Sequence, residues 1–319
     1  MLKSKLLFVF LLVVVTCSSL YGAGSHYKYE LYDAAITYES EKALLTKKWL
    51  KLESNGANSL DIAYLEGPRR TDQQSLLLIH GFAATKEGWL RFAAELSDRY
   101  HVVIIDLPGH GESTKDLSLD YSIETQVENV HKIVQVLKLE PFHIAGNSMG
   151  GAISSLYAAK YPNKIKTVTL YDPAGIHDVE SEMMTLLKQG KNPLIVTDAK
   201  SFEELLSFAM EKPPFIPWPI TEVAAEKASS KQQINTKIFT DIVSGDKGLF
   251  KEELKKIKSP TLIVWGTEDR VINVGNADIF ERLISGSKKV ILQGIGHAPM
   301  IEVPEQSANL LDMFINNPA

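Results

Sequence analysis

The chain has 319 residues, 45% of them hydrophobic, which is enough to bury a large core in one α/β domain or in a domain carrying an inserted subdomain. Its formal net charge of −5 at pH 7 leaves no basic excess, so no nucleic-acid partner and no long-range attraction to anionic lipid are expected. The single cysteine, Cys17, excludes an intramolecular disulfide.

Residues 1–24 are expected to be a targeting or anchoring segment. Two lysines precede the apolar run 6–15, and the uncharged stretch continues to Ser25. Three interpretations stay open: a signal peptide cleaved near a small residue such as Gly22, a retained membrane anchor, and a lipoprotein modified at Cys17. All three place the remaining chain outside the cytosol, in the cell envelope or secreted.

Residues 25–48 are predicted to contain an amphipathic helix beside this segment. Apolar side chains recur at helical spacing through Tyr29–Leu45 and share roughly one face: Leu31, Ala34, Ala35, Tyr38 and Leu45. Two positions stay open for this helix. It lies flat on a membrane surface, or it packs against the domain.

From Trp49 onward the pattern predicts a sheet. Two strands joined by a turn at Asn55-Gly56 come first, and short apolar runs then alternate with helical patterns. The predicted strands are 49–52, 60–65, 76–79, 102–105, 142–145, 168–171, 261–265 and 290–292. The expected fold class is α/β, with a mostly parallel eight-stranded sheet covered by helices on both faces. Functional residues should gather beyond the carboxyl ends of its strands.

One segment departs from this alternation. Residues 176–258 hold helical patterns and no convincing strand, and they are too long for an ordinary connection. We therefore expect a helical cap inserted between core segments 49–175 and 259–319. Phe215 and Trp218, in the Pro/aromatic patch 213–219, are expected at an apolar substrate entrance or against lipid. The alternative is a rigid hinge packed on the core.

Ser148 is the candidate nucleophile. It follows the apolar run 142–145, precedes a helical pattern, and has Gly146 and Gly150 two residues to either side. This G-x-S-x-G spacing is typical of a sharp strand-to-helix turn, where side chains at the flanking positions would collide with neighbouring elements. The helix that follows directs its first N–H groups toward any oxyanion formed at the serine.

A serine hydroxyl needs a base that takes its proton and an acid that orients the base. His297, on the glycine-rich loop after the last strand, is the candidate base. Asp269, just past the strand 261–265, is the candidate acid, and the order serine, acid, histidine fits the motif. Asp172, just past the strand 168–171, is the alternative acid, although it is expected to shape the cap entrance instead.

The oxyanion donors are expected to be the backbone N–H of Met149 and that of Phe82, in the loop His80-Gly81-Phe82. His80 is interpreted as a hydrogen-bonding partner within that loop. His80, Asn147 and Asp172 are also candidates for the border of the substrate pocket, with Phe215 and Trp218.

No metal site and no cofactor are expected. The loop Asp106–Ser113 carries glycines around His110, but neither phosphate-binding glycine motif is present, so a structural turn is predicted. No H-E-x-x-H and no cluster of Cys and His residues occurs in the sequence.

Taken together, these motifs resemble the α/β-hydrolase superfamily from Leu60 to the C-terminus. The runs 62–67, 89–93, 145–152 and 297–302 are similar to small bacterial membrane-associated lipases, a group with Moraxella/Psychrobacter-type lipases and a Pseudomonas membrane-anchored phospholipase A. The resemblance implies ester hydrolysis on acyl lipids by the Ser148–Asp269–His297 triad, a helical cap, and an N-terminal membrane helix. Ala298 departs from the bulkier residue that relatives often carry, which bears on pocket shape.

The predicted function is therefore a serine carboxylic-ester hydrolase, a lipase, esterase or phospholipase A, that works through an acyl-enzyme. Two alternatives stay open: carbon–carbon bond or cofactor-free peroxide chemistry on the same fold, and a non-catalytic binding protein. The sequence does not decide acyl-chain length, head group, or whether the chain forms a homodimer.

Overall fold

The computed structural model describes residues 24–53, 59–139, 141–245 and 247–318. The predicted signal or anchor segment up to residue 23, with Cys17, and the Asn55-Gly56 turn lie outside the described residues. Within the described ranges, no helix is both long enough and apolar enough to cross a membrane.

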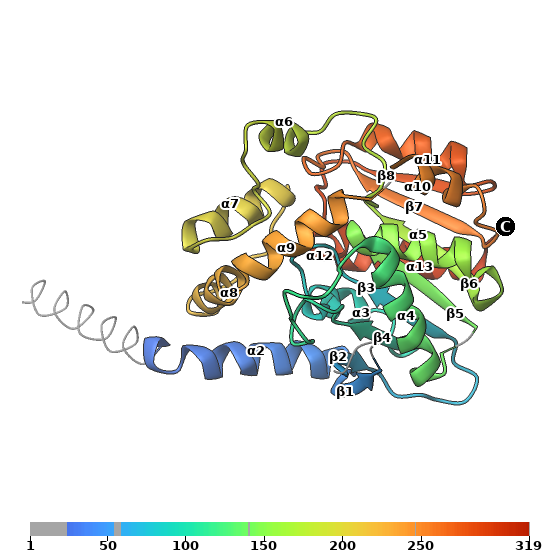
Figure 1. The fold of residues 1–319 in the computed structure, drawn as a ribbon. Coiled ribbons are helices and arrows are strands. Elements are labelled where there is room, and N and C mark those ends of the chain that lie inside the picture. Colours follow the sequence, from blue (N-terminus) through green and yellow to red (C-terminus); the bar gives the residue numbers. More distant parts are fainter. Residues whose placement is uncertain (1–23, 54–58, 140, 246, 319) are drawn as a thin grey trace, which may run out of the picture.

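All eight predicted strands are present in one sheet (Figure 1). They are β1 (Thr46–Leu52), β2 (Leu60–Glu66), β3 (Ser75–Ile79), β4 (His101–Ile105), β5 (Phe142–Asn147), β6 (Ile165–Tyr171), β7 (Thr261–Gly266) and β8 (Lys288–Leu292). Their spatial order is β1-β2-β4-β3-β5-β6-β7-β8. Only the β1–β2 and β2–β4 pairs are antiparallel, so the predicted mostly parallel α/β sheet is confirmed.

Helices cover both faces of the sheet. Successive residues of a strand point to opposite faces, so a continuously apolar strand presents apolar side chains to the helices on each face. Leu77 and Ile79 of β3 join the core of one face, and Leu76 and Leu78 join that of the other. The first face carries α4 (Ile123–Leu137), α5 (Met149–Lys160), α10 (Lys247–Leu254) and α11 (Ala277–Leu283). The second carries the 3₁₀ turn Lys86–Trp89, α3 (Leu90–Ala94), α12 (Pro299–Glu302) and α13 (Pro304–Asn316). Two further 3₁₀ turns are Pro162–Lys164 and Val274–Asn276.

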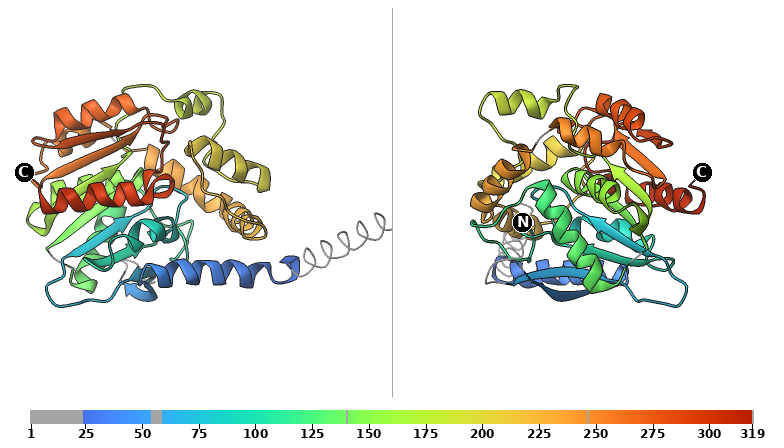
Figure 2. Two further views of the ribbon diagram at one scale, coloured as in Figure 1. Left: turned by 180° about the vertical axis from the view of Figure 1, so that it is seen from behind. Right: turned by 45° about the vertical axis from the view of Figure 1, so that its right-hand side comes forward.

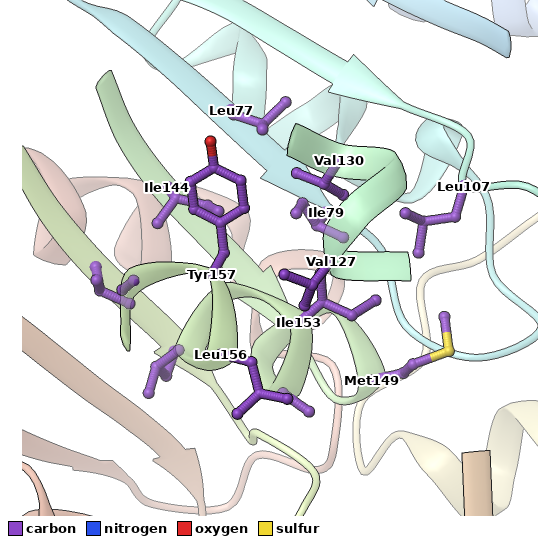
Figure 3. Packing of buried hydrophobic residues seen from close by; sticks show 14 of the residues in the cluster. Leu77, Ile79, Leu107, Val127, Val130, Ile144, Met149, Ile153, Leu156 and Tyr157 are labelled. Atoms are coloured by element: carbon purple, nitrogen blue, oxygen red, sulfur yellow. The ribbon is translucent and has the colours of Figure 1, made fainter. Parts of the chain in front are cut away.

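The packing of α4 and α5 on the sheet holds the site in place. Figure 3 shows Val127 and Val130 of α4 and Ile153 of α5 grouped around Ile79, with Ile144 of the neighbouring strand close by. All five side chains are 2% exposed or less. Burying one aliphatic side chain of this size stabilises the folded state by about 1.5–3 kcal/mol. This packing therefore holds α5 on the sheet, and with it Met149, the first residue of the helix.

The inserted segment forms a cap beside the carboxyl ends of the strands (Figures 1 and 2). It consists of α6 (Glu182–Lys188), α7 (Ala199–Ala209), α8 (Ile220–Ser229) and α9 (Gln232–Val243). The predicted cap range 176–258 also includes α10, which differs from these helices. Its residues Phe250 and Leu254 are buried in the core against α5 and α11, so α10 belongs to the core layer.

The N-terminal helix α2 (Lys28–Lys42) lies along one edge of the molecule and packs on α3 and α8 (Figure 1). On its predicted apolar face, Leu31 and Tyr38 are exposed, whereas Leu45, just past the end of the helix, is buried. Ile36 of the helix packs against the core, and polar contacts attach it as well. Lys28 binds Glu222 at 2.8 Å, and Glu39 accepts from Arg91 at 2.9 Å.

Candidate active site

Ser148 occupies a sharp turn between β5 and α5, with φ +54°. A Cβ on Gly146 would lie 2.2 Å from the carbonyl oxygen of Gly150, and a Cβ on Gly150 would lie 2.3 Å from that of Ile79. Neither position therefore tolerates a side chain. The serine N–H donates to Tyr171 at 3.0 Å, which ties the turn to the end of β6.

Asp269 and His297 are hydrogen-bonded to each other at the same edge of the sheet. His297 Nδ1 lies 2.8 Å from Asp269 Oδ2, and both residues are buried. Asp269 Oδ2 also accepts from Trp265 Nε1 at 3.1 Å. Its other oxygen accepts from the N–H groups of Val271 and Ile272 at 2.8 and 2.9 Å. Four hydrogen bonds to one carboxylate fix its orientation.

Asn147 joins the serine turn to the histidine loop. Its side-chain amide donates to the carbonyl oxygen of His297 at 2.9 Å and to that of Tyr171 at 3.1 Å. Ser148 and His297 themselves form no hydrogen bond with each other in the described structure. Catalytic hydrogen bonds of this type are often long before substrate binds and shorten in the complex.

The loop after β3 passes directly beside the serine. A Cβ on Gly81 would lie 3.2 Å from the Cβ of Ser148. His80 Nε2 accepts from the Leu107 N–H at 3.1 Å, so its Nδ1 carries the proton and donates to the Gly81 carbonyl at 2.8 Å. Since the C=O and N–H of a trans peptide point in opposite directions, His80 also orients the Phe82 N–H.

The two expected oxyanion donors are available. In the described part of the chain, neither the Phe82 N–H nor the Met149 N–H donates to a protein acceptor. Burial lowers the pKa of His80, which keeps the ring neutral in its loop role. The interpretation of His80 as a loop hydrogen-bonding residue fits this geometry.

An apolar cavity of about 430 Å³ opens beside Ser148. Phe82 and Met149 line it on the core side, and cap helices close it with residues at helical spacing: Met183, Met184 and Leu187 of α6, and Phe239, Ile242 and Val243 of α9. Sequence reasoning missed these six, although their i, i+3, i+4 apolar pattern within the cap is the signal that could have found them.

None of the five residues expected at the border of the substrate pocket lines this cavity. Phe215 is 85% exposed and does not line the cavity. Trp218 does not line it either, since its ring lies against Gly24 and its Nε1 donates to Glu222. His80 and Asn147 are buried behind the loops that they brace.

Asp172 lies behind the site as well and does not border the cavity. It is fully buried just past β6, with φ +45°, and its Oδ1 accepts from the Gly266 N–H at 2.9 Å. Asp172, Asp269 and His297 each bring one polar atom within 4.8 Å of the other two. Of the two carboxylates, only that of Asp269 is hydrogen-bonded to the imidazole.

The loop Asp106–Ser113 folds around its own buried carboxylate. Asp106 accepts from the N–H and the Nζ of Lys86 at 2.8 and 2.7 Å, and from the Glu112 N–H. Gly111 has φ +53°, and a Cβ there would lie 2.0 Å from Asp106. Burial alone would raise the pKa of Asp106, but Lys86 holds it below its ordinary value. The predicted structural turn fits these contacts.

Glu302 connects the histidine loop to the cap, a role that the sequence did not indicate. Its Oε1 accepts from the Gly296 N–H at 2.9 Å, and its Oε2 accepts from the N–H groups of Glu211 and Lys212 at 2.9 and 2.8 Å. The His297 N–H donates to Ala209 at 2.7 Å. The end of α7 is therefore bound directly to the loop that carries the imidazole.

The sheet, the turn at Ser148 and the hydrogen-bonded acid and histidine define an α/β hydrolase. Residues 74–304 match the family of the alpha/beta hydrolase fold, and the chain belongs to this family. Among its relatives, Lipase 3 of Moraxella sp. (strain TA144) is 36% identical over 279 residues, which cover 86% of each chain. Monoacylglycerol lipase ABHD6 of Bos taurus is 34% identical over 253 residues, covering 76% of this chain and 75% of that protein.

A solved structure extends the similarity to almost the entire chain. The crystal structure of a membrane phospholipase A, described as a bacterial virulence factor, matches with a TM-score of 0.87. The two chains are 36% identical, and the match covers 99% of each. The resemblance expected from the motifs is confirmed.

Proposed function

We propose that the protein is a serine carboxylic-ester hydrolase acting on acyl lipids. The observation that carries this proposal is the position of Ser148, at a strained turn on the rim of an apolar cavity, beside a buried His297–Asp269 pair. The relatives named as lipases and as a phospholipase A support an ester bond as the target.

The reaction proceeds through an acyl-enzyme. Ser148 Oγ attacks the ester carbonyl carbon while His297 Nε2 takes its proton, and the N–H groups of Phe82 and Met149 hold the oxyanion. Asp269, bonded to Nδ1, orients the imidazole and stabilises it when it is protonated. His297 then gives the proton to the departing alcohol. Water activated by His297 releases the acid.

The substrate class follows from the cavity lining. Aromatic, aliphatic and methionine side chains surround the space next to the serine, and they suit an acyl chain better than a polar acyl group. Besides Ser148, the polar residues of the lining are His177, Glu124 and Lys188. A fatty acyl ester with a polar alcohol fits this distribution.

An acyl-length series of p-nitrophenyl esters, run beside a phospholipase A₁/A₂ assay, tests the proposal with the wild type and Ser148→Ala. We expect hydrolysis by the wild type with a maximum at a medium or long acyl chain, and loss of activity in the variant. Ser148→Ala turning over the esters at the wild-type rate contradicts the proposal. A ring-cleavage dione assayed in parallel tests the alternative of carbon–carbon bond hydrolysis.

We also propose that the protein works at a membrane in the cell envelope. The exposed side of α2 carries Leu31 and Tyr38, and Tyr27 just before the helix is exposed too. This segment follows the uncharged N-terminal stretch. Phe215 on the cap is the most exposed large apolar side chain of the described residues. Co-sedimentation with neutral phospholipid vesicles tests this. Leu31→Glu with Tyr38→Glu should weaken binding, and unchanged sedimentation contradicts the proposed role of this side of α2.

A further inference from the structure

The carboxyl group of Asp172 has fewer hydrogen-bond donors around it than a buried, ionised carboxylate needs. The side chain is completely buried, and its Oδ1 accepts one bond, from the Gly266 N–H at 2.9 Å. Its Oδ2 has no partner, although the atom is shielded from water. A buried carboxylate oxygen without a donor is costly, because nothing replaces the water that solvated it.

The groups around Asp172 increase this cost. Asp269 lies close by with a carboxylate that accepts four hydrogen bonds, and Glu302 adds a second negative charge nearby. Tyr171 and the imidazole of His297 are the other titratable groups at this position. Burial, followed by the charge of Asp269, raises the pKa of Asp172 well above its ordinary value.

Two carboxyl groups this close in a dry site carry one negative charge between them. The charge resides on the group with more donors, which is Asp269, and the proton resides on Asp172. A protonated carboxyl has an O–H donor beside its carbonyl acceptor, so it accounts for both oxygens of Asp172. The carbonyl oxygen accepts from Gly266, and the unpartnered oxygen becomes a donor.

We propose that Asp172 is a neutral carboxylic acid that donates its proton to Asp269, and that it is a positioning residue for the His297–Asp269 pair. The acid–carboxylate pair keeps a single negative charge at the imidazole and limits the ways in which the Asp269 carboxylate can turn. This inference rests on the proposed function, because Asp172 performs no chemistry of its own and acts only through Asp269.

The first experiment does not depend on activity. Infrared difference spectra of the full chain, wild type minus Asp172→Asn at pH 7, should contain a carbonyl band of a protonated carboxylic acid that the variant lacks. Spectra without such a band overturn the proposal. Because this signal requires no ester turnover, it separates failure of this inference from failure of the proposed hydrolase function.

The second experiment compares an isosteric and a truncated side chain. Asparagine can accept from Gly266 and donate to Asp269, so Asp172→Asn should retain most of the kcat for p-nitrophenyl butyrate. Asp172→Ala should lower kcat about tenfold to a hundredfold with little change in KM, as expected for loss of a hydrogen bond to a charged group. Equal losses in the two variants overturn the proposal. If Asp172→Ala does not fold, the kcat of Asp172→Asn and the infrared difference spectrum still test the proposal.

A third comparison uses the removal of the neighbouring charge. In Asp269→Asn the reason for Asp172 to stay neutral is weakened, so Asp172 should ionise more readily and support His297 in its place. The activity of Asp269→Asn should then rise with pH more steeply than that of the double variant Asp172→Asn/Asp269→Asn. Identical pH profiles for the two proteins contradict the proposal.

Discussion

The imidazole of His297 and the carboxylate of Asp269 are joined by a 2.8 Å hydrogen bond across 28 positions of the chain. Each lies on a loop after a neighbouring strand, β7 or β8, whose carboxyl ends meet at the same edge of the sheet. The bond leaves Nε2 as the ring nitrogen that can serve Ser148. The proposed chemistry therefore depends on this imidazole.

Replacing the imidazole should reduce turnover while leaving the fold intact. His297→Gln removes the base, and general acid–base catalysis contributes typically 10²–10⁴-fold, so kcat for a p-nitrophenyl ester should fall by about that factor. His131→Gln is the matched control, because His131 of α4 stacks on Tyr161, at the opposite end of α5 from Ser148. Comparable losses in the two variants contradict the role of His297.

Glu302 should be needed for the position of the histidine loop. Glu302→Gln exchanges one of the two acceptor oxygens for a donor that faces backbone N–H groups, and losing a charged hydrogen bond costs about 1.5–3 kcal/mol. We expect faster amide hydrogen exchange at Gly296, Glu211 and Lys212, together with a lower kcat. Glu305→Gln, at an exposed position nearby, is the control. Unchanged exchange at all three amides contradicts the proposed connection.

Lys86 should be a major determinant of stability. Its side chain and that of Asp106 are both fully buried and lie 2.7 Å apart. Lys86→Met leaves a buried carboxylate without its cation, so the free energy of unfolding should fall by about 3–5 kcal/mol. Lys47→Met, which removes a half-exposed lysine from Glu112, should cost less than about 1 kcal/mol. Urea unfolding measures both, and equal changes contradict the prediction.

His143 should make the protein sensitive to acid. The ring is held between Thr167 and Gln74 at 2.8 Å each, and burial lowers its pKa to about 4 from an ordinary value of 6.5. The unfolded chain therefore binds a proton before the folded chain does as the pH falls. The stability present above pH 6.5 is lost toward pH 4, by up to about 1.4 kcal/mol per pH unit.

His143→Gln removes this titration. Unfolding free energies measured between pH 7 and about pH 4 should fall less steeply for the variant than for the wild type. His143 lies at the end of the sheet away from Ser148, so ester hydrolysis at pH 7 should be retained. Parallel curves for the two proteins contradict the assignment of a lowered pKa.

The strands were predictable because short, continuous apolar runs have few other uses in a chain of this composition. The order of Ser148, Asp269 and His297 was equally informative, since glycines and strand ends mark each position. Both signals are local in the sequence. Because the carboxyl ends of parallel strands meet at one edge of the sheet, residues just past those ends come close together in the fold.

The remaining features depend on contacts between distant segments. The apolar pattern of α2 left two positions open for this helix, because its ion pairs with Glu222 of α8 and Arg91 of α3 depend on helices far away in the chain. The Pro/aromatic patch left open whether Phe215 lies at a substrate entrance, against lipid or in a hinge, because only the packing of the cap decides which side such a residue faces. The surroundings of Asp172 likewise depend on the pairing of β6 with β7, so the sequence could not indicate that one of its oxygens is buried without a partner.

Covalent trapping of the serine tests the central claim most directly. The full chain is treated with a fluorophosphonate until ester hydrolysis stops, and the modified peptide is identified by mass spectrometry. We predict one adduct per chain, located on Ser148, with residual activity proportional to the unmodified fraction. Full modification of Ser148 with activity retained, or inactivation with the adduct on another residue, would contradict the account.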